Sequence, residues 1–134
     1  MSKKSNPGRL RPTDAELEIL RVLWHEHGAT VRQVHAALNA GRTDGPGYTT
    51  VLKLMQIMTT KGLVDRDESQ RPQMYTSHHG RTDTQRQLVR DLLRRAFGGS
   101  HRELVLQVLA DQKASAAELQ EIEALLDRFD EEKP

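Results

Sequence analysis

The chain has 134 residues, a formal net charge of +1, 29% charged residues and no cysteine. Without cysteine it can form neither disulfides nor a thiolate metal site. Its longest apolar runs are far shorter than the roughly 18 residues that span a bilayer. Residues 1–12 lack the apolar stretch of a secretory signal. These features are typical of a cytoplasmic protein with no direct membrane association.

Charge is distributed unevenly along the chain. Residues 1–112 contain 17 of the 20 basic and 12 of the 19 acidic residues, so a basic body precedes an acidic C-terminal helix. A basic body attracts a phosphate backbone, although ordinary variation in surface charge would explain the same asymmetry. We expect a flexible basic arm at 1–10, a first domain at 11–78 and a helical domain at 79–132.

Four Ser or Thr residues are each followed three positions later by Glu or Gln, which is the capping-box pattern of a helix start. The pairs are Thr13–Glu16, Thr30–Gln33, Ser100–Glu103 and Ser115–Glu118. The first helix is expected to end near Gly28 and the second near 39–41. A glycine-rich polar loop then leads into a third helix at about 48–61, which Gly62 ends.

The next segment changes from helical to extended character. Leu63–Asp67 and Gln73–Thr76 flank a polar turn and predict a β-hairpin. Three helices followed by a hairpin is the order of a winged helix-turn-helix, in which the third helix enters the DNA major groove and the hairpin, or wing, follows the backbone. The sequence therefore predicts a mainly α fold with a small β-hairpin wing at 63–76.

The third helix has two different faces. The apolar positions have the spacing of a buried stripe: Val51, Leu54, Met55 and Met58. The opposite face is polar, and its first residues are Thr49, Thr50, Lys53 and Gln56. Gln pairs with adenine, Lys donates to guanine and a Thr methyl packs on thymine, so we predict that these four residues read bases. A merely solvated polar face is the alternative.

Further polar residues are candidates for contacts with the DNA backbone. They are Arg66, Arg71 and Gln73 of the wing and Arg9 and Arg11 of the N-terminal segment. Tyr75, by contrast, is expected in the core at the base of the wing.

From Arg81 onward, three amphipathic helices are predicted. Their apolar positions include Leu88, Leu92, Leu93, Phe97, Leu104, Val108, Ile122, Leu125, Leu126 and Phe129. Three short helices make a poor independent core, so we expect them to pack against a second copy in a homodimer. Folding back on the N-terminal domain of a monomer is the alternative.

Taken together, these segments resemble the penicillinase repressor family, which includes methicillin-resistance repressors and copper-responsive relatives. The matching runs are Thr13–Leu20 with Trp24, Tyr48–Leu52, Lys61–Val64, Tyr75 and Gly99–Leu106. The resemblance implies an N-terminal winged helix, a C-terminal dimerisation domain, and repression by a homodimer on an inverted-repeat operator in double-stranded DNA. It places the family's base-contacting positions on Thr49, Thr50 and Lys53.

The resemblance also implies how repression ends. In well-known members a membrane sensor protease, acting in trans, cuts the repressor at a bond that matches Gln107–Val108, where the familiar resistance repressors have Asn–Phe. The paired cysteines of the copper-responsive relatives are missing here. Ile57 replaces a basic residue often found late in the recognition helix, so operator preference is expected to differ.

Two other classes of function fit parts of the sequence. His25 and His27 suggest a metal site, but residues i and i+2 of a helix face about 200° apart. No nucleophile elbow or phosphate-binding glycine loop is present, so we predict no enzyme activity, cofactor or metal. A winged helix can also act as a protein-interaction adaptor without specific DNA binding; the basic arm, the wing arginines and the polar third helix favour DNA.

Overall fold

The computed structural model describes residues 11–111 and 115–131. The expected basic arm at 1–10, with Arg9, lies outside these residues. The chain divides into two units, residues 1–89 and 90–134. Helix α5, Arg81–Phe97, contributes residues to both units.

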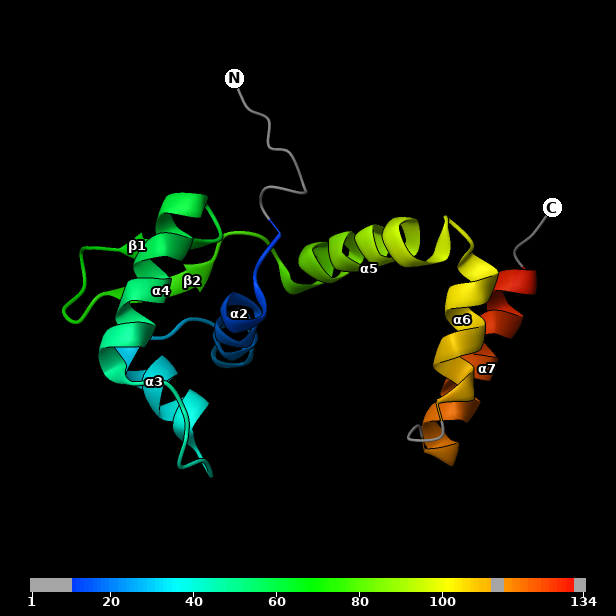
Figure 1. Cartoon of the computed structure of the whole chain (residues 1–134), viewed down its shortest axis with the longest axis horizontal. Helices are drawn as coiled ribbons and strands as arrows, with labels where there is room; N and C mark the ends of the chain where they lie inside the picture. The colour runs from blue at the N-terminus through cyan, green and yellow to red at the C-terminus, as the bar shows by residue number, and fades with distance from the viewer. Residues whose placement is uncertain (1–10, 112–114, 132–134) are drawn as a thin grey trace, which may run out of the picture. The chain divides into compact units, whose positions relative to one another are not determined.

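The first unit contains three helices followed by a hairpin (Figure 1). The helices are α2 (Asp14–Glu26), α3 (Val31–Asn39) and α4 (Tyr48–Lys61), and the strands are β1 (Val64–Asp67) and β2 (Met74–Ser77). The strands are antiparallel, with Val64 opposite Ser77 and Asp67 opposite Met74. This arrangement confirms the predicted fold class, a winged helix with further helices after it.

The helices begin where the capping pairs predict. At the start of α2, the hydroxyl of Thr13 accepts from the Glu16 N–H at 3.2 Å, and the Glu16 carboxylate accepts from the Thr13 N–H at 2.9 Å. Each bond satisfies a backbone donor that has no partner inside the helix. The same two bonds join Thr30 and Gln33, and the hydroxyls of Ser100 and Ser115 accept from the N–H groups of Glu103 and Glu118.

Helix α4 has the predicted bounds because a glycine ends it. Gly62 lies in the left-handed region with φ of 82°, and its N–H donates to carbonyls of the last turn. A side chain at this position would strain the backbone, which is why glycine is favoured there. The next N–H, of Leu63, donates to the Met58 carbonyl at 2.9 Å. The chain therefore leaves the helix and enters β1 within three residues.

The core of the first unit lies between α2, α3, α4 and the hairpin. Every buried hydrophobic side chain among the described residues falls between Ile19 and Tyr75. Val51, Met55 and Met58 of α4 are completely buried, and Leu54 is half-buried. These residues fix which face of α4 points inward, and Tyr75 belongs to the core as predicted.

The turn between α2 and α3 also pairs with the wing. The Ala29 N–H donates to the Tyr75 carbonyl at 3.0 Å, and the Tyr75 N–H donates to the Ala29 carbonyl at 2.9 Å. Gly28 precedes this bridge with φ of 108°, and a Cβ there would lie 3.1 Å from Cγ2 of Thr76. The sequence does not predict this pairing, because a single-residue bridge has no periodicity.

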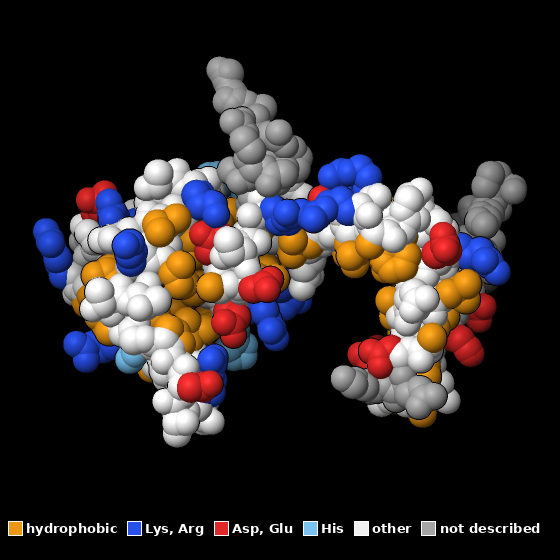
Figure 2. Space-filling model, in the orientation of Figure 1, with side chains coloured by type: hydrophobic (Ala, Val, Ile, Leu, Met, Phe, Trp, Pro, Cys, Tyr) orange, Lys and Arg blue, Asp and Glu red, His pale blue; other side chains and the backbone are white. Residues whose placement is uncertain are grey.

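The second unit contains the end of α5 together with α6 (His101–Ala110) and α7 (Ala116–Glu131). None of the side chains described between residues 90 and 129 is buried. Hydrophobic side chains are visible at the surface of the part that holds α5, α6 and α7 (Figure 2). The large exposed ones in this unit are Leu92, Val105, Leu106, Val108, Leu125, Leu126 and Phe129.

Several other residues of the predicted dimer surface are half-buried. They are Leu88, Leu93, Phe97, Leu104 and Ile122. Across the described residues, no helix combines the length and apolar character needed to cross a membrane.

Candidate DNA-binding face

Helix α4 presents one polar face outward. Its exposed side chains include Thr49, Thr50, Lys53 and Gln56, which lie opposite the completely buried Val51, Met55 and Met58. At 3.6 residues per turn, these four positions fall within one sector of about 120° on the helix surface. The helix has no acidic residue, so Lys53 gives this face a positive charge. The structure thus brings the predicted base-reading residues together on one accessible surface.

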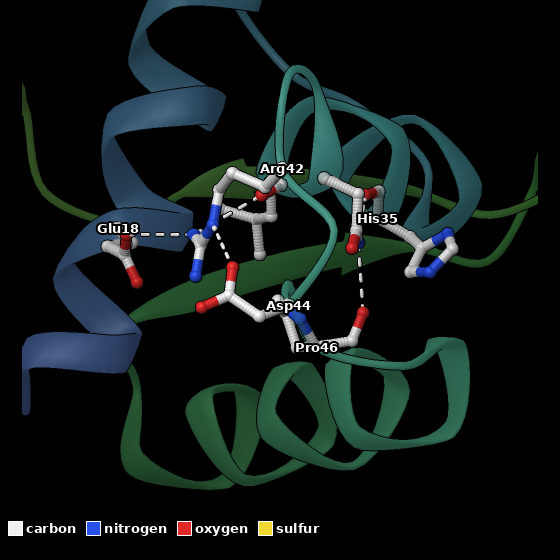
Figure 3. A network of polar contacts seen from close by, with 7 residues as sticks. Glu18, His35, Arg42, Asp44 and Pro46 are labelled. Carbon is white, nitrogen blue, oxygen red and sulfur yellow. Dashed lines mark hydrogen bonds and ion pairs between the residues drawn. The ribbon is translucent and has the colours of Figure 1, made fainter.

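The loop before α4 is held by a polar network (Figure 3). The side-chain amide of Asn39 donates to the carbonyls of His35 and Pro46, both at 2.9 Å. The Arg42 guanidinium donates to the Leu38 carbonyl at 3.3 Å and lies 3.8 Å from a carboxylate oxygen of Glu18. These contacts fix the loop to α2 and α3, and therefore set where α4 begins.

The first turn of α4 also contacts α3 directly. The ring of Tyr48 meets the ring of His35 edge to face, with centroids 5.8 Å apart and planes at 74°. Beside Tyr48 lies a hollow of about 480 Å³, whose lining also includes Arg32 of α3 and Gln73 of the wing. The predicted backbone contact Gln73 is therefore close to the start of α4.

The last turn of α4 is tied to α2 by an ion pair. Lys61 Nζ donates to the two carboxylate oxygens of Glu16 at 2.7 and 3.0 Å. Only 3% of the Glu16 side chain is exposed. Burial alone raises the pKa of Glu16, but hydrogen bonds from Lys61 and Thr13 and the Lys61 charge together hold that pKa below its ordinary value of 4.5.

The sequence analysis assigns Glu16 only to the capping box and does not identify this pair. A signal was present, because Glu16 is three, four and seven positions before the core residues Ile19, Leu20 and Leu23. A carboxylate on that face is buried and needs a cationic partner. Nothing local identifies the partner, which is 45 residues away.

The wing turn is shaped by a carboxylate. Asp67 accepts hydrogen bonds from the backbone N–H of Ser69 at 3.0 Å, from its hydroxyl at 2.6 Å and from the Gln70 amide at 3.0 Å. These bonds lower the pKa of Asp67 from its ordinary value of 3.8, and the bond from the Ser69 hydroxyl has the largest effect. This turn uses side-chain hydrogen bonds in place of the Asn-Gly chemistry of tight hairpins.

The other predicted backbone contacts differ in accessibility. Arg71 in the wing turn and Arg11 before α2 are exposed. Arg66 on β1 is half-buried, with Nη2 3.6 Å from a carboxylate oxygen of Glu68. Arg71 is therefore the wing arginine best placed to reach a phosphate, and its contact with DNA stays a prediction.

The predicted cleavage bond lies within a helix. Gln107 and Val108 are both exposed and belong to α6. Cleavage at this bond also stays a prediction.

Three helices, a paired hairpin and an outward polar third helix define this chain as a winged-helix protein. The family model described as penicillinase repressor matches residues 12–128. The chain belongs to the penicillinase repressor family, a family of transcriptional repressors, and the resemblance inferred from the sequence is confirmed.

Two sets of relatives illustrate the similarity. The chain is 35% identical over 94 residues to "Transcriptional regulator BlaI" of the Mycobacterium tuberculosis strains CDC 1551 / Oshkosh and ATCC 25618 / H37Rv, covering 69% of this chain and 67% of theirs. It is 24% identical over 115 residues to "Penicillinase repressor" of Bacillus licheniformis, covering 86% of this chain and 88% of that protein.

Proposed function

We propose that this protein represses transcription by binding an inverted-repeat operator as a homodimer, with α4 in the major groove and the β1–β2 wing on the backbone. The observation that carries the proposal is the two-sided character of α4. Three side chains of its inner face are completely buried and hold the helix in the core, while its outer face offers Thr49, Thr50, Lys53 and Gln56 to a partner. The family to which the chain belongs supports a repressor role.

The order of these side chains suits the geometry of a recognition helix. The N-terminal turns of such a helix meet the base edges first, and here those turns carry Thr49, Thr50 and Lys53. Lys53 donates to guanine O6 and N7, and Gln56 in the next turn forms a paired contact with adenine. Arg71 and Arg11 bind phosphates and help to fix the register.

The second unit provides the dimer contact. Its helices expose a set of large apolar side chains and bury none of those described between 90 and 129. A second copy with the same helices covers this surface on both partners at once, because a two-fold interface is self-complementary. Two-fold symmetry in the protein requires an inverted repeat in the DNA.

Cleavage between Gln107 and Val108 by a sensor protease acting in trans would separate α7 from the rest of the chain and end repression. The bond lies inside α6 (His101–Ala110). A protease that binds its substrate as an extended strand must therefore first unwind part of that helix.

Binding to DNA from upstream of the protein's own gene tests the proposal directly. Fluorescence anisotropy is measured at about 150 mM salt beside a scrambled duplex, because affinity without a stated salt concentration has little meaning. Affinity for the upstream DNA about a thousandfold or more above the scramble is expected of an operator-binding regulator. Equal, weak binding to this DNA and to fragments tiled across the neighbouring genes would favour a protein-interaction adaptor.

Replacing Lys53 by alanine is expected to weaken specific binding by about 1–3 kcal/mol, the range for a good base contact. The matched variant Arg71→Ala should weaken binding to operator and scramble alike, because a phosphate contact carries no sequence information. The two variants are compared on operators with single base-pair changes. If Lys53→Ala bound every sequence equally less well, Lys53 would be a phosphate contact.

A further inference from the structure

One side chain on the outer face of α4 does not share the polar character of its neighbours. Ile57 is 41% exposed, and it lies in the same sector as Thr50 and Lys53, seven and four residues before it. Among the described residues from 11 to 78, only Tyr48 and Ile57 are large exposed hydrophobics, and both belong to α4.

The core does not account for this exposure. The inner face of α4 is complete without Ile57, which belongs neither to the buried core nor to the partly buried hydrophobics packed against it. Tyr48 has an explanation within the protein, since its ring contacts His35. Ile57 is therefore an apolar group held on a rigid helix and directed at whatever α4 binds.

The major groove offers one apolar group, the C5-methyl of thymine. We propose that Ile57 packs against a thymine methyl in each half-site and so sets part of the operator preference, an inference that rests on the proposed binding of α4 in the major groove. Isoleucine is branched at Cβ and has essentially one χ1 rotamer in a helix, so little side-chain freedom is lost on contact.

The helix geometry indicates where this thymine lies. Ile57 is seven residues beyond Thr50, and at 1.5 Å per residue this is a distance of about 10.5 Å along the axis. Base pairs are about 3.4 Å apart. The thymine is therefore at most about three base-pair steps from the position that Thr50 contacts, and fewer steps away when the helix crosses the groove at an angle.

A thymine-to-uracil scan of the operator tests the inference, because it removes one methyl group and leaves the hydrogen-bonding edges of the base intact. Each dT in a half-site is replaced by dU, and binding of the full-length protein is measured by anisotropy. At one position, loss of the methyl should weaken wild-type binding about fourfold, the effect of one buried methyl group, and about fifteenfold when both half-sites are changed.

The decisive comparison is with the variant Ile57→Ala. This variant should bind the dT and dU operators equally at that position, whereas Ile57→Val should retain most of the difference. Thr60→Ser is the matched control, since it removes a methyl group from an exposed residue of the same face and keeps a hydroxyl for the Gln56 carbonyl. It should leave the uracil effect unchanged. Ile57→Ala should fold, because alanine is the better helix former.

The outcomes separate this inference from the proposed function. If the wild-type protein distinguished operator from scramble but showed no uracil effect at any position, or the same effect in Ile57→Ala, Ile57 would not contact a thymine methyl. The operator-binding function would then still stand. If the wild-type protein did not distinguish operator from scramble, the proposed function itself would fail.

Discussion

Replacing Lys61 by methionine is expected to lower the free energy of unfolding at pH 7 by about 3 kcal/mol, the lower end of the range for breaking a buried ion pair. Methionine keeps much of the length of the side chain but leaves the Glu16 carboxylate without its cation. That carboxylate is almost completely buried, so water cannot replace the lost bonds. Urea unfolding measures the change.

Two further variants show whether the pair is responsible. Lys53→Met removes an exposed lysine from the same helix and should change stability by no more than about 0.5 kcal/mol. In a double-mutant cycle, Glu16→Gln combined with Lys61→Met should restore part of the loss, because a neutral amide needs no cation and can still accept from the Thr13 N–H. If the two substitutions changed the free energy of unfolding by purely additive amounts, the two residues would not interact.

Acid should reduce the difference in the free energy of unfolding between the wild-type protein and Lys61→Met. The pKa of Glu16 is lowered in the folded protein, so the unfolded chain binds more protons in the acid range. The stability from Glu16 is thus fully present above its ordinary pKa of 4.5 and is lost as the pH falls through the lower, folded value. In Lys61→Met the carboxyl is protonated more easily, so the stability gap should narrow below about pH 4.5. A gap that is the same at pH 3.5 and pH 7 would contradict this assignment.

Two aspartates introduced into α7, Leu125→Asp with Phe129→Asp, should convert the proposed dimer to a monomer and weaken operator binding by about a hundredfold or more. The two side chains are on one apolar face and are 46% and 66% exposed, so the substitutions add charge without disturbing a core. Without the dimer, the second half-site contact becomes bimolecular, and the advantage of linking two binding modules is lost. Sedimentation and anisotropy measure the two effects.

Ala124→Asp serves as the control for that pair. Ala124 is exposed on the opposite side of α7, so a charge there should leave both dimerisation and DNA binding unchanged. A dimer that survived the paired aspartates would show that the interface lies elsewhere in the chain.

The features predicted from sequence are those set by neighbouring residues. The capping pairs begin α2, α3, α6 and α7 because each hydroxyl reaches a backbone N–H three residues away. Gly62 ends α4 because the chain there needs positive φ. The polar and buried faces of α4 follow from 3.6-residue periodicity alone, and they define the candidate site.

The features that could not be predicted depend on contacts between distant segments. The partner of Glu16 is 45 residues away, and the periodicity of α2 shows only that some partner is needed. Arg66 is only two residues before Glu68, but its half-burial follows from the fold and not from local composition. The network around Asn39 likewise depends on how the loop closes.

The bridge between Ala29 and Tyr75 connects the wing to the turn before α3 by backbone hydrogen bonds. A hairpin joined to its domain only through its two ends could bend like a flap. Here both backbone bonds of the bridge resist such bending, so a force on the wing turn would be transmitted to the start of α3. The angle of the wing is thus fixed before any ligand is met, and little ordering remains to oppose binding.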